Sequence, residues 1–417
     1  MSHTVELIAV GTELLLGNIV NSDAQMLSQE LSALGLNVHY HSVVGDNPAR
    51  LKQVVEHAKS RADILITTGG LGPTCDDLTK TVLADAFGKK LVHDARSEER
   101  IRGYFARMGR TMTENNLAQA MLPEGCVIFD NDWGTAPGCA FEENGIHAIM
   151  LPGPPSECMP MFRTHAIPYL RRLSEGIIVS RSLRVFGMGE SAVETLLRDK
   201  MDSLTNPTLA PYAKTGEVEL RITAKADTEE EARKLIIPVE AEVREILGDL
   251  IYGADVPSLE AALVPLLAER GLTLGCAESC TGGLFAKRIT DVPGASKVFR
   301  GGIVSYTNEV KTNLLGVSPK LLEDEGAVSR PVAEAMAVGA RRALGCDIAV
   351  SFTGVAGPGP DDRGNPEGLV FVAVTDGTTV RVRKLVQGHG RDRIRTTAVH
   401  YGLDMVRRLL LGLDHSN

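Results

Sequence analysis

Apolar and polar positions follow two rhythms along the first part of the chain. Short apolar runs such as residues 5–10 and 64–67 alternate with stretches in which apolar residues recur every three to four positions, such as residues 48–59. The runs are typical of buried strands and the longer spacing of amphipathic helices. We therefore expect a parallel sheet covered by helices on both faces, with a ligand site beyond the carboxyl ends of its strands.

The pattern changes after the basic, polar stretch at residues 171–175. Val218, Leu220 and Ile222 alternate with polar residues, which predicts a half-buried antiparallel strand. The remaining segments complete a β-α-β-β-α-β order, the split βαβ pattern. We expect strands at residues 183–186, 208–213, 217–224 and 250–252, and helices at 190–201 and 228–247.

The last part of the chain returns to alternating strands and helices. We expect strands at residues 272–276, 302–306, 348–353, 369–375 and 379–385, and helices at 259–270, 281–289, 331–344 and 391–411. The predicted fold class is α/β: two three-layer α/β domains, at residues 1–171 and 256–417, joined by a small α+β split βαβ domain at residues 172–255.

Composition narrows the class of protein. The 417 residues fit about three domains. There are 44 Lys and Arg residues against 53 Asp and Glu residues, and no long basic run, so a nucleic-acid partner is not expected. No signal-like start and no apolar run of about 18 residues occurs, so we expect a cytoplasmic protein without a membrane partner. The seven cysteines lack C-x-x-C pairs and favour reduced thiols.

The first candidate for chemistry is the segment Ala-Glu-Ser-Cys-Thr-Gly-Gly at residues 277–283. It lies between an apolar run and a helical pattern, which predicts a sharp strand-to-helix turn that exposes Ser279 as a nucleophile. The backbone N–H groups of Thr281, Gly282 and Gly283 are the expected oxyanion donors. Cys280 could itself be the nucleophile, although a small residue that fills the turn is the favoured interpretation.

A second strand end, at residues 305–311, offers Tyr306 and Lys311 but no histidine. If the two turns meet, they form a Ser–Lys hydrolase site with Lys311 as base and Tyr306 orienting or relaying the proton. The lysine pKa must then lie well below its free value of about 10.4, as burial away from acids would achieve. The alternative is that Ser279 caps a helix and Lys311 is a solvated surface lysine.

The N-terminal half has a different candidate. Residues 67–72, Thr-Thr-Gly-Gly-Leu-Gly, end an apolar strand in a loop that can point N–H groups at an anion. Asp76 and Asp77 follow this loop, and Asp46 ends a neighbouring strand. A phosphate loop beside carboxylates is what metal-assisted pyrophosphate chemistry requires. We expect a divalent metal ion held by Asp46, Asp76 and Asp77, with Asp77 also catalytic.

These segments resemble a known family. Residues 277–283, 305–311 and 353–358 are similar to the three signatures of the nicotinamide-nucleotide amidase domain, and residues 11–17 and 67–77 resemble the molybdopterin-binding-like domain of the CinA family. Both halves occur in this order over essentially the whole chain. The resemblance implies a protein that deamidates nicotinamide mononucleotide without a cofactor and hydrolyses ADP-ribose to AMP and ribose 5-phosphate.

The family pattern also implies substrate contacts on both halves. In the amidase half they are Thr353, Gly354, Gly357, Arg391 and Arg395; in the N-terminal half they are Thr12, Glu13, Asn21, Thr68, Gly69, Gly70, Gly72, Gly153 and Glu157. The two arginines lie one turn apart at a helix start, which suits a 5′-phosphate. Surface arginines, and helix capping by Thr12, Glu13 and Asn21, are the alternatives.

The sequence departs from the family pattern in two places. Pro360, Asp361 and Asp362 replace a glycine-rich continuation, and Gly390 replaces an acid before Arg391. Two other functions stay open: pterin binding or nucleotidyl transfer by the N-terminal half, and a non-enzymatic regulator. We expect a homodimer, since middle units in the family look like dimer elements, whereas the acidic run at residues 229–231 argues against RNA binding.

Overall fold

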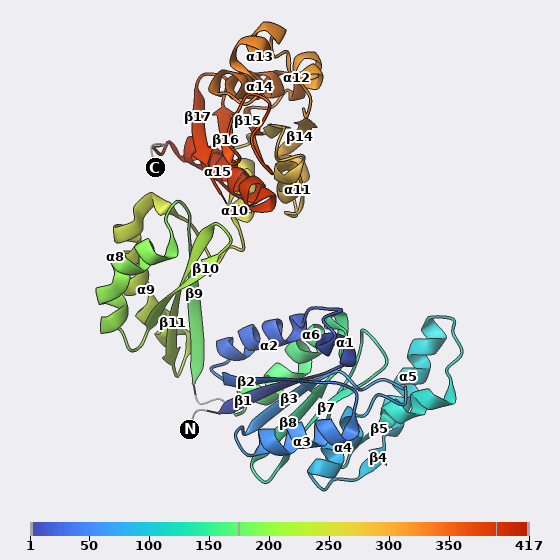
Figure 1. The fold of residues 1–417 in the computed structure, drawn as a ribbon. Coiled ribbons are helices and arrows are strands. Elements are labelled where there is room, and N and C mark those ends of the chain that lie inside the picture. The colour runs from blue at the N-terminus through green and yellow to red at the C-terminus, as the bar shows by residue number, and fades with distance from the viewer. Residues whose placement is uncertain (1–2, 174–175, 389, 415–417) are drawn as a thin grey trace. The chain divides into compact units, whose positions relative to one another are not determined.

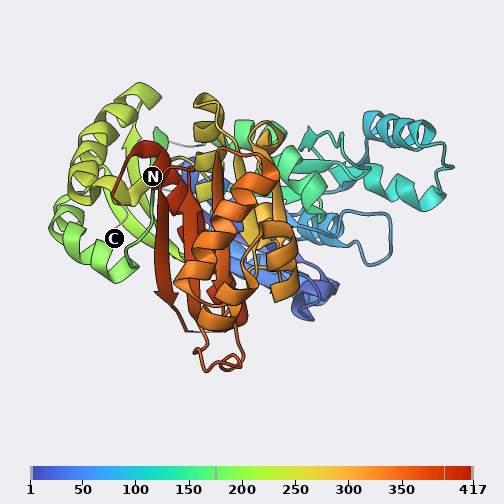
Figure 2. The same cartoon turned by 90° about the horizontal axis from the view of Figure 1, so that it is seen from above.

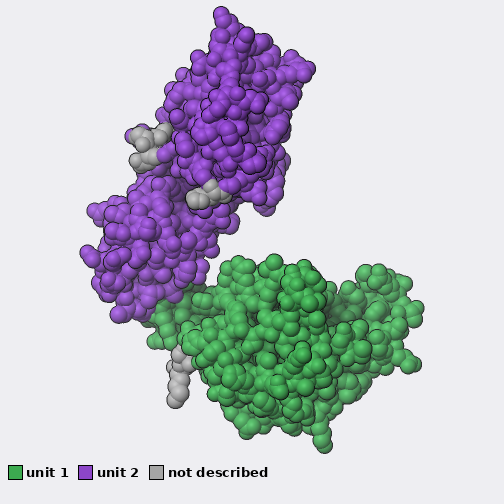
Figure 3. Space-filling view, in the orientation of Figure 1, with its two compact units in different colours: residues 1–180, 224–235 green, residues 181–223, 236–417 purple. Residues whose placement is uncertain are grey.

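A computed structural model describes residues 3–173, 176–388 and 390–414. Contacts divide the chain into two compact units, residues 1–180 with 224–235 and residues 181–223 with 236–417 (Figure 3). The three-domain division with boundaries at 171/172 and 255/256 stays a prediction. Residues 174 and 175 of the basic stretch lie outside the described residues.

The N-terminal part is built on a six-stranded sheet in the order β2-β1-β3-β8-β7-β6. The first four strands pair in parallel and the last two are antiparallel. Their bounds are β1 Thr4–Val10, β2 Asn37–Val44, β3 Ile64–Thr68, β6 Val127–Phe129, β7 Gly138–Glu143 and β8 Ile146–Leu151. Val5 and Leu7 join the core on one face of this sheet, and Ile8 and Val10 join the core on the other.

Helices cover both faces of this sheet, as predicted, but the sheet is mixed and not all parallel, because β7 and β6 join it as antiparallel strands. α2 and α6 lie on one face, and α3 and α4 lie on the other (Figure 1). The helical bounds are α1 Thr12–Leu15, α2 Ser22–Ala33, α3 Pro48–Lys59, α4 Thr79–Ala86, α5 Ala95–Arg107, η1 Glu114–Ala120, α6 Pro155–Met161, η2 Phe162–Ala166 and α7 Ile167–Arg171. The short strands β4 (Leu91–His93) and β5 (Met121–Pro123) pair antiparallel.

The middle part has the predicted β-α-β-β-α-β order. Its elements are β9 Ile177–Val185, α8 Glu190–Ser203, β10 Thr208–Lys214, β11 Glu217–Ala226, α9 Glu229–Leu247, η3 Gly248–Leu250 and β12 Ile251–Ala254. The sheet order β10-β11-β9-β12 places β9 and β11 side by side in the centre, which is the split βαβ arrangement. The first strand begins at Ile177 and is longer than predicted.

The C-terminal part has the five predicted strands in one mixed sheet, in the order β14-β13-β15-β16-β17. The first three strands are parallel and the last two antiparallel. α14 packs across β13, β15 and β16 (Figure 2), while α15 contacts β15, β16, α10 and α11. The bounds are α10 Leu259–Glu269, β13 Leu274–Glu278, α11 Leu284–Thr290, η4 Ala295–Lys297, β14 Phe299–Val304, α12 Asn308–Leu315, α13 Pro319–Glu325, α14 Arg330–Leu344, β15 Ile348–Gly354, β16 Leu369–Thr375, β17 Val380–Val386 and α15 Arg391–Leu411.

All seven cysteines are free, as expected from their spacing. Within the described ranges, no helix has both the length and the apolar character needed to cross a membrane.

Candidate functional sites

Ser279 lies on a tight turn that links β13 to α11. The N–H of Gly282 donates to the Ser279 carbonyl at 3.1 Å and closes the turn. Gly282 and Gly283 have φ angles of +58° and +94°, a left-handed conformation that side chains with a Cβ rarely adopt. The sequence therefore forms the predicted strand–turn–helix, which leaves the Ser279 side chain partly exposed beside a cavity.

Glu278 stabilises this turn through hydrogen bonds, and the sequence analysis did not identify it. Its carboxylate is fully buried and accepts hydrogen bonds from the N–H groups of Gly283 at 3.0 Å, Phe285 at 3.1 Å and Ala286 at 2.9 Å. These donors belong to the start of α11, where N–H groups lack intrahelical partners and a negative charge is favoured. An acid directly before a glycine turn and a helix was the available signal.

These contacts correct the expected oxyanion donors. The Gly282 and Gly283 N–H groups already donate, to the Ser279 carbonyl and to Glu278, and cannot also face a substrate. Among the described residues, the N–H groups of Cys280 and Thr281 have no acceptor. The residue after the nucleophile supplies an oxyanion donor in other strand–turn–helix sites, so the N–H of Cys280 is a candidate donor beside that of Thr281.

Lys311 meets Ser279, although the two residues are far apart in sequence. The Lys311 side chain is 1% exposed, and its Nζ lies 3.2 Å from Ser279 Oγ, 2.9 Å from the Ser305 carbonyl oxygen and 3.5 Å from that of Tyr306. No carboxylate of the described residues pairs with it. Burial lowers the pKa of the Lys311 amine, because the charged form loses its water.

The structure brings the carbonyl of Tyr306, and not its phenol, to the lysine. The Tyr306 side chain is 61% exposed, and its hydroxyl accepts a hydrogen bond from Arg391 Nη2 at 3.4 Å. A proton relay through the phenol has no hydrogen bond to support it in this arrangement, and Tyr306 instead lines the cavity wall beside Arg391.

Cys280 is placed as a core residue. Its side chain is 6% exposed and packs in the main hydrophobic cluster of the C-terminal part. Burial raises the pKa of its thiol to about 12. Because the nucleophile in cysteine chemistry is the thiolate, a thiol that stays protonated at neutral pH favours Ser279 over Cys280.

A cavity of about 350 Å³ opens beside the Ser279–Lys311 pair. Thr353, Gly354 and Arg391, three of the expected substrate contacts, line it. Thr353 Oγ1 donates to the Ala327 carbonyl at 2.6 Å, so this side chain anchors the cavity wall. The wall also contains Arg363 together with Asp361 and Asp362, two of the residues that depart from the family pattern.

The two predicted arginines have different surroundings. Arg391 is exposed in the cavity and donates from Nη1 to the Gly357 carbonyl at 2.8 Å. Arg395 is not among the described residues that line the cavity. Its Nη2 instead donates to the Thr281 carbonyl in the nucleophile turn at 2.7 Å. Arg391 is therefore placed to meet a substrate, whereas Arg395 braces the turn.

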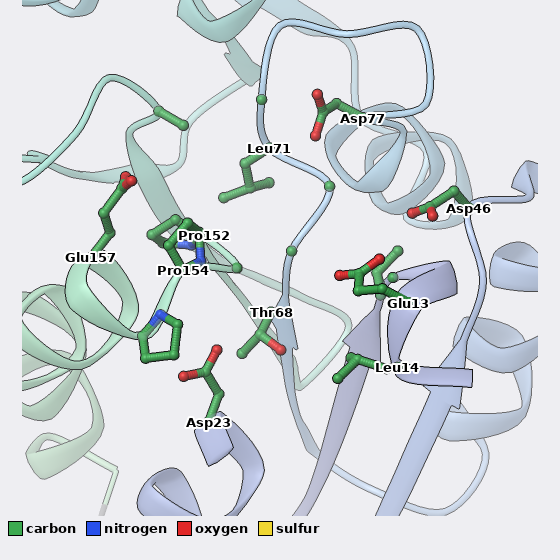
Figure 4. A pocket seen from close by; sticks show the side chains of 18 of the residues that line it. Glu13, Leu14, Asp23, Asp46, Thr68, Leu71, Asp77, Pro152, Pro154 and Glu157 are labelled. Atoms are coloured by element: carbon green, nitrogen blue, oxygen red, sulfur yellow. The ribbon is translucent and has the colours of Figure 1, made fainter. Parts of the chain in front are cut away.

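A larger cavity of about 540 Å³ lies in the N-terminal part, beyond the carboxyl ends of β1, β2, β3 and β8 (Figure 4). Most of the predicted residues line it: Glu13, Asn21, Asp46, Thr68, Gly69, Gly70, Gly72, Asp76, Asp77, Gly153 and Glu157. Thr12 is not in this lining. Its N–H donates to Asp46 Oδ2 at 2.9 Å, and its hydroxyl accepts from the Asp46 N–H at 3.1 Å, so it fixes Asp46.

The glycine loop after β3 has the geometry of an anion site. Gly69 and Gly70 have φ angles of +91° and +67°, and a Cβ on Gly69 would lie 2.3 Å from the Val10 carbonyl oxygen. Among the described residues, the N–H groups of Gly70, Leu71 and Gly72 find no acceptor. Successive free N–H groups of this kind form a concave site for phosphate.

The side chains with charge around this loop are acidic, and no basic side chain of the described residues accompanies them in the cavity lining. The lining carboxylates are Glu13, Asp23, Asp46, Asp76, Asp77 and Glu157, and no lysine, arginine or histidine lines the described part of the cavity. Asp77 Oδ2 accepts from the N–H and hydroxyl of Thr74 at 2.8 and 2.5 Å. Across the described ranges, no three His, Cys, Asp or Glu side chains form a ready-made metal cluster.

The remaining predicted residues combine structural and cavity roles. Asn21 Oδ1 accepts from the Ala24 N–H at 3.1 Å, so it caps α2 and lines the cavity as well. Glu157 Oε2 accepts from Asn131 Nδ2 at 2.7 Å. A Cβ on Gly153 would approach the Gly69 Cα to 3.2 Å, which allows the two loops to pack closely.

Together these features define a modular α/β protein with a serine–lysine pair in one part and a glycine loop over an acidic cavity in another. Residues 6–172 match the family model of a probable molybdopterin binding domain, residues 180–253 that of the damage-inducible protein CinA KH domain, and residues 256–410 that of the CinA C-terminal domain.

Full-length relatives agree with these matches. A CinA-like protein of Dictyoglomus turgidum is 50% identical over 408 residues, 98% of this chain and 99% of that protein, and one of Dictyoglomus thermophilum is 49% identical over the same shares. The crystal structure of the competence/damage inducible protein CihA from Agrobacterium tumefaciens is 38% identical with a TM-score of 0.35, and covers 36% of this chain and 93% of that chain. The chain belongs to the CinA family.

Proposed function

We propose that the Ser279 site hydrolyses the carboxamide of nicotinamide mononucleotide to nicotinic acid mononucleotide and ammonia. The observation that supports this best is the 3.2 Å contact between Ser279 Oγ and the buried Nζ of Lys311. A carboxamide is a poor electrophile, so its hydrolysis needs a nucleophile, a base and oxyanion donors. Ser279, Lys311 and the free N–H groups of Cys280 and Thr281 are candidates for these roles.

Burial lowers the pKa of Lys311 and so favours the neutral amine that this chemistry needs. As a neutral amine, Nζ donates to the Ser305 carbonyl and turns its lone pair to the Ser279 hydroxyl, reversing the hydrogen bond of the ammonium form. Ser279 Oγ attacks the carboxamide carbon while Nζ takes its proton. Collapse of the oxyanion breaks the C–N bond, and the ammonium of Lys311 returns the proton to the leaving ammonia.

Water completes the cycle at the resulting nicotinoyl ester. Nζ, neutral again, accepts a proton from the attacking water, and the same two N–H groups face the second oxyanion. Loss of the acid product then restores the Ser279 hydroxyl with the proton from Lys311. All of these steps use groups of the protein, so we propose that the amidase needs no cofactor. Arg391 lies at the cavity wall, where it can hold the 5′-phosphate.

Ammonia release from nicotinamide mononucleotide tests this proposal. Ser279→Ala is expected to remove at least about 10³-fold of the rate, as for other nucleophiles. Cys280→Ala is the matched control on the neighbouring residue and keeps most of the rate. An active Ser279→Ala variant together with an inactive Cys280→Ala variant would transfer the role of nucleophile to the thiol.

For the N-terminal cavity we propose metal-dependent hydrolysis of ADP-ribose to AMP and ribose 5-phosphate. The free N–H groups at residues 70–72 can hold a phosphate, but the surrounding carboxylates would repel a diphosphate. One or two of Asp46, Asp76 and Asp77, which do not form a three-ligand cluster in this structure, would supply the hard oxygen ligands that magnesium-like ions prefer. Such ions usually combine one or two carboxylates with substrate phosphates, which fits a cavity without a three-ligand cluster. A bound divalent cation would neutralise the diphosphate and make water more acidic.

Product analysis decides between this activity and the alternatives. ADP-ribose should be cleaved with a divalent cation and left intact with a chelator, while ammonia release stays unchanged. A cavity that binds a pterin tightly and leaves ADP-ribose intact with every cation would favour pterin binding or nucleotidyl transfer. Failure of both hydrolytic assays would favour a non-enzymatic regulator.

A further inference from the structure

Asp23 is a buried acid without a partner in the wall of the N-terminal cavity. It is the second residue of α2 and 6% exposed, and its Oδ1 has no hydrogen-bond partner within the described residues. Figure 4 shows its carboxyl group pointing into the cavity below Thr68 and Pro154. An unsatisfied buried carboxyl oxygen costs free energy unless a ligand supplies the missing hydrogen bond.

The surroundings of Asp23 differ from those of the proposed metal ligands. Apolar side chains line the same cavity: Leu14 from α1, Ile19 and Val20 from the loop before α2, Pro152 and Pro154 from the loop after β8, and Pro155 at the start of α6. Ile19 and Val20 are 53% and 84% exposed. A flat aromatic ring would cover this apolar surface and bring its polar edge to Asp23, while a diphosphate extends to the glycine loop.

We propose that this end of the cavity is a nucleobase subsite in which the protonated carboxyl of Asp23 recognises adenine, donating to ring N1 and accepting from the 6-amino group. The proposal rests on the proposed hydrolysis of ADP-ribose and identifies its base-reading residue. An ionised carboxylate only accepts hydrogen bonds and would instead suit guanine or a pterin, whose edges present adjacent N–H donors.

Burial of Asp23 favours the protonated form, and no basic side chain of the described residues lines the cavity to oppose it. The charged groups that line the same cavity are carboxylates, Glu13 from α1, Asp46 after β2, Asp76 and Asp77 after β3, and Glu157 from α6. α6 adds the thiol of Cys158, and β2 adds His41, whose Nε2 lies 3.0 Å from Ser28 on the next turn of α2. Burial raises the pKa of Asp23 to about 6, although the start of a helix favours a negative charge.

Binding of AMP to the full-length protein with magnesium tests the subsite without relying on catalysis. If only the protonated form binds adenine, affinity falls about 50-fold between pH 6 and pH 8, and calorimetry in buffers of different ionisation enthalpy detects uptake of close to one proton near pH 8. Asp23→Asn presents the same donor and acceptor at every pH. This variant should bind AMP with a flatter pH dependence and without the extra proton uptake.

Two comparisons make the outcome decisive. GMP should bind more weakly than AMP to both proteins, and Glu30→Gln, an α2 variant whose wild-type partner is Arg163, should behave as the wild type. Equal pH profiles for the wild type and Asp23→Asn, or a wild-type preference for GMP or a pterin, would overturn the subsite. If ADP-ribose is cleaved but the wild type and Asp23→Asn bind AMP with equal pH profiles, only the subsite is refuted. If AMP binding depends on Asp23 as expected but ADP-ribose is not cleaved, only the proposed reaction is refuted.

Discussion

Replacing Lys311 with methionine removes the proposed base and keeps an unbranched apolar stem in its buried place. The Nζ–Oγ distance of 3.2 Å lies at the edge of the range in which a general base can take a proton. A positioned base contributes about 10²–10⁴-fold, which corresponds to about 2.7–5.5 kcal/mol of the barrier. We therefore expect kcat for ammonia release to fall by about 10³-fold, with KM for nicotinamide mononucleotide little changed.

The pH profile identifies the group that is lost. Because burial lowers the pKa of Lys311, the wild-type kcat/KM should rise with pH through an apparent pKa below that of free lysine and then level off. The methionine variant should lack this limb. Lys311→Arg keeps the positive charge but cannot deprotonate, so it should be as inactive as the methionine variant.

The same substitution should stabilise the fold at neutral pH. The folded-state pKa of Lys311 lies below the unfolded value of about 10.4, so the charged amine destabilises the folded state at low pH, and this cost fades as pH rises through the folded pKa. The melting temperature of Lys311→Met should exceed that of the wild type at pH 7, with a smaller gap near pH 10. Ammonia release within tenfold of the wild type, or an inactive variant that melts well below it, would refute the role of Lys311 as base.

Three further substitutions separate the parts of the two sites. Arg391→Ala should raise KM for the mononucleotide without affecting nicotinamide riboside, which lacks the phosphate, and equal effects on both substrates would refute the assignment of the phosphate contact to Arg391. Arg395→Ala should lower kcat for both substrates. Glu278→Gln replaces a carboxylate that accepts three backbone hydrogen bonds, so it should cost about 1–3 kcal/mol of stability in thermal unfolding and reduce kcat, and an unchanged melting temperature would count against its role in the turn. Asp77→Asn should abolish metal-dependent cleavage of ADP-ribose and spare ammonia release; chromatography that finds AMP from this variant would exclude Asp77 as a required ligand.

The pairing of Ser279 with Lys311 was predictable in part, because it follows from strand topology. β13 and β14 are neighbouring parallel strands, and their register places Glu278 beside Val304. The residues that follow each strand therefore emerge at the same edge of the sheet, where Ser305 and α12 carry Lys311 to the nucleophile. Both strand ends are visible in the sequence as apolar runs followed by helix starts, whereas the pairing of the two strands, on which the predicted site depended, is given by the structure.

The direction in which a side chain points from a helix, and the position of a residue in a folded loop, were not predictable in this way. Arg391 and Arg395 are one turn apart on α15, yet one faces the cavity and the other the carbonyl of Thr281. The lining role of Asp361 depends on a loop fixed by its hydrogen bonds to Asn365, at 2.8 Å from both the backbone and the side-chain nitrogen. The sequence does not distinguish Asp23 from other acids in the first turn of a helix, because only the three-dimensional structure shows its burial.

Glu278 raises a question that bears on the whole amidase proposal, because a buried carboxylate next to the nucleophile should favour a charged lysine. Its oxygens, however, accept three backbone N–H groups from the start of α11, so its charge is balanced within the turn. The shift in the Lys311 pKa comes from burial and is opposed by Cys280, whose own pKa of about 12 keeps that thiol neutral near pH 7. Desolvation of the amine therefore acts without an effective counter-charge. A serine–lysine site can in this way keep an acid next to its nucleophile in the sequence while burial still lowers the pKa of its base.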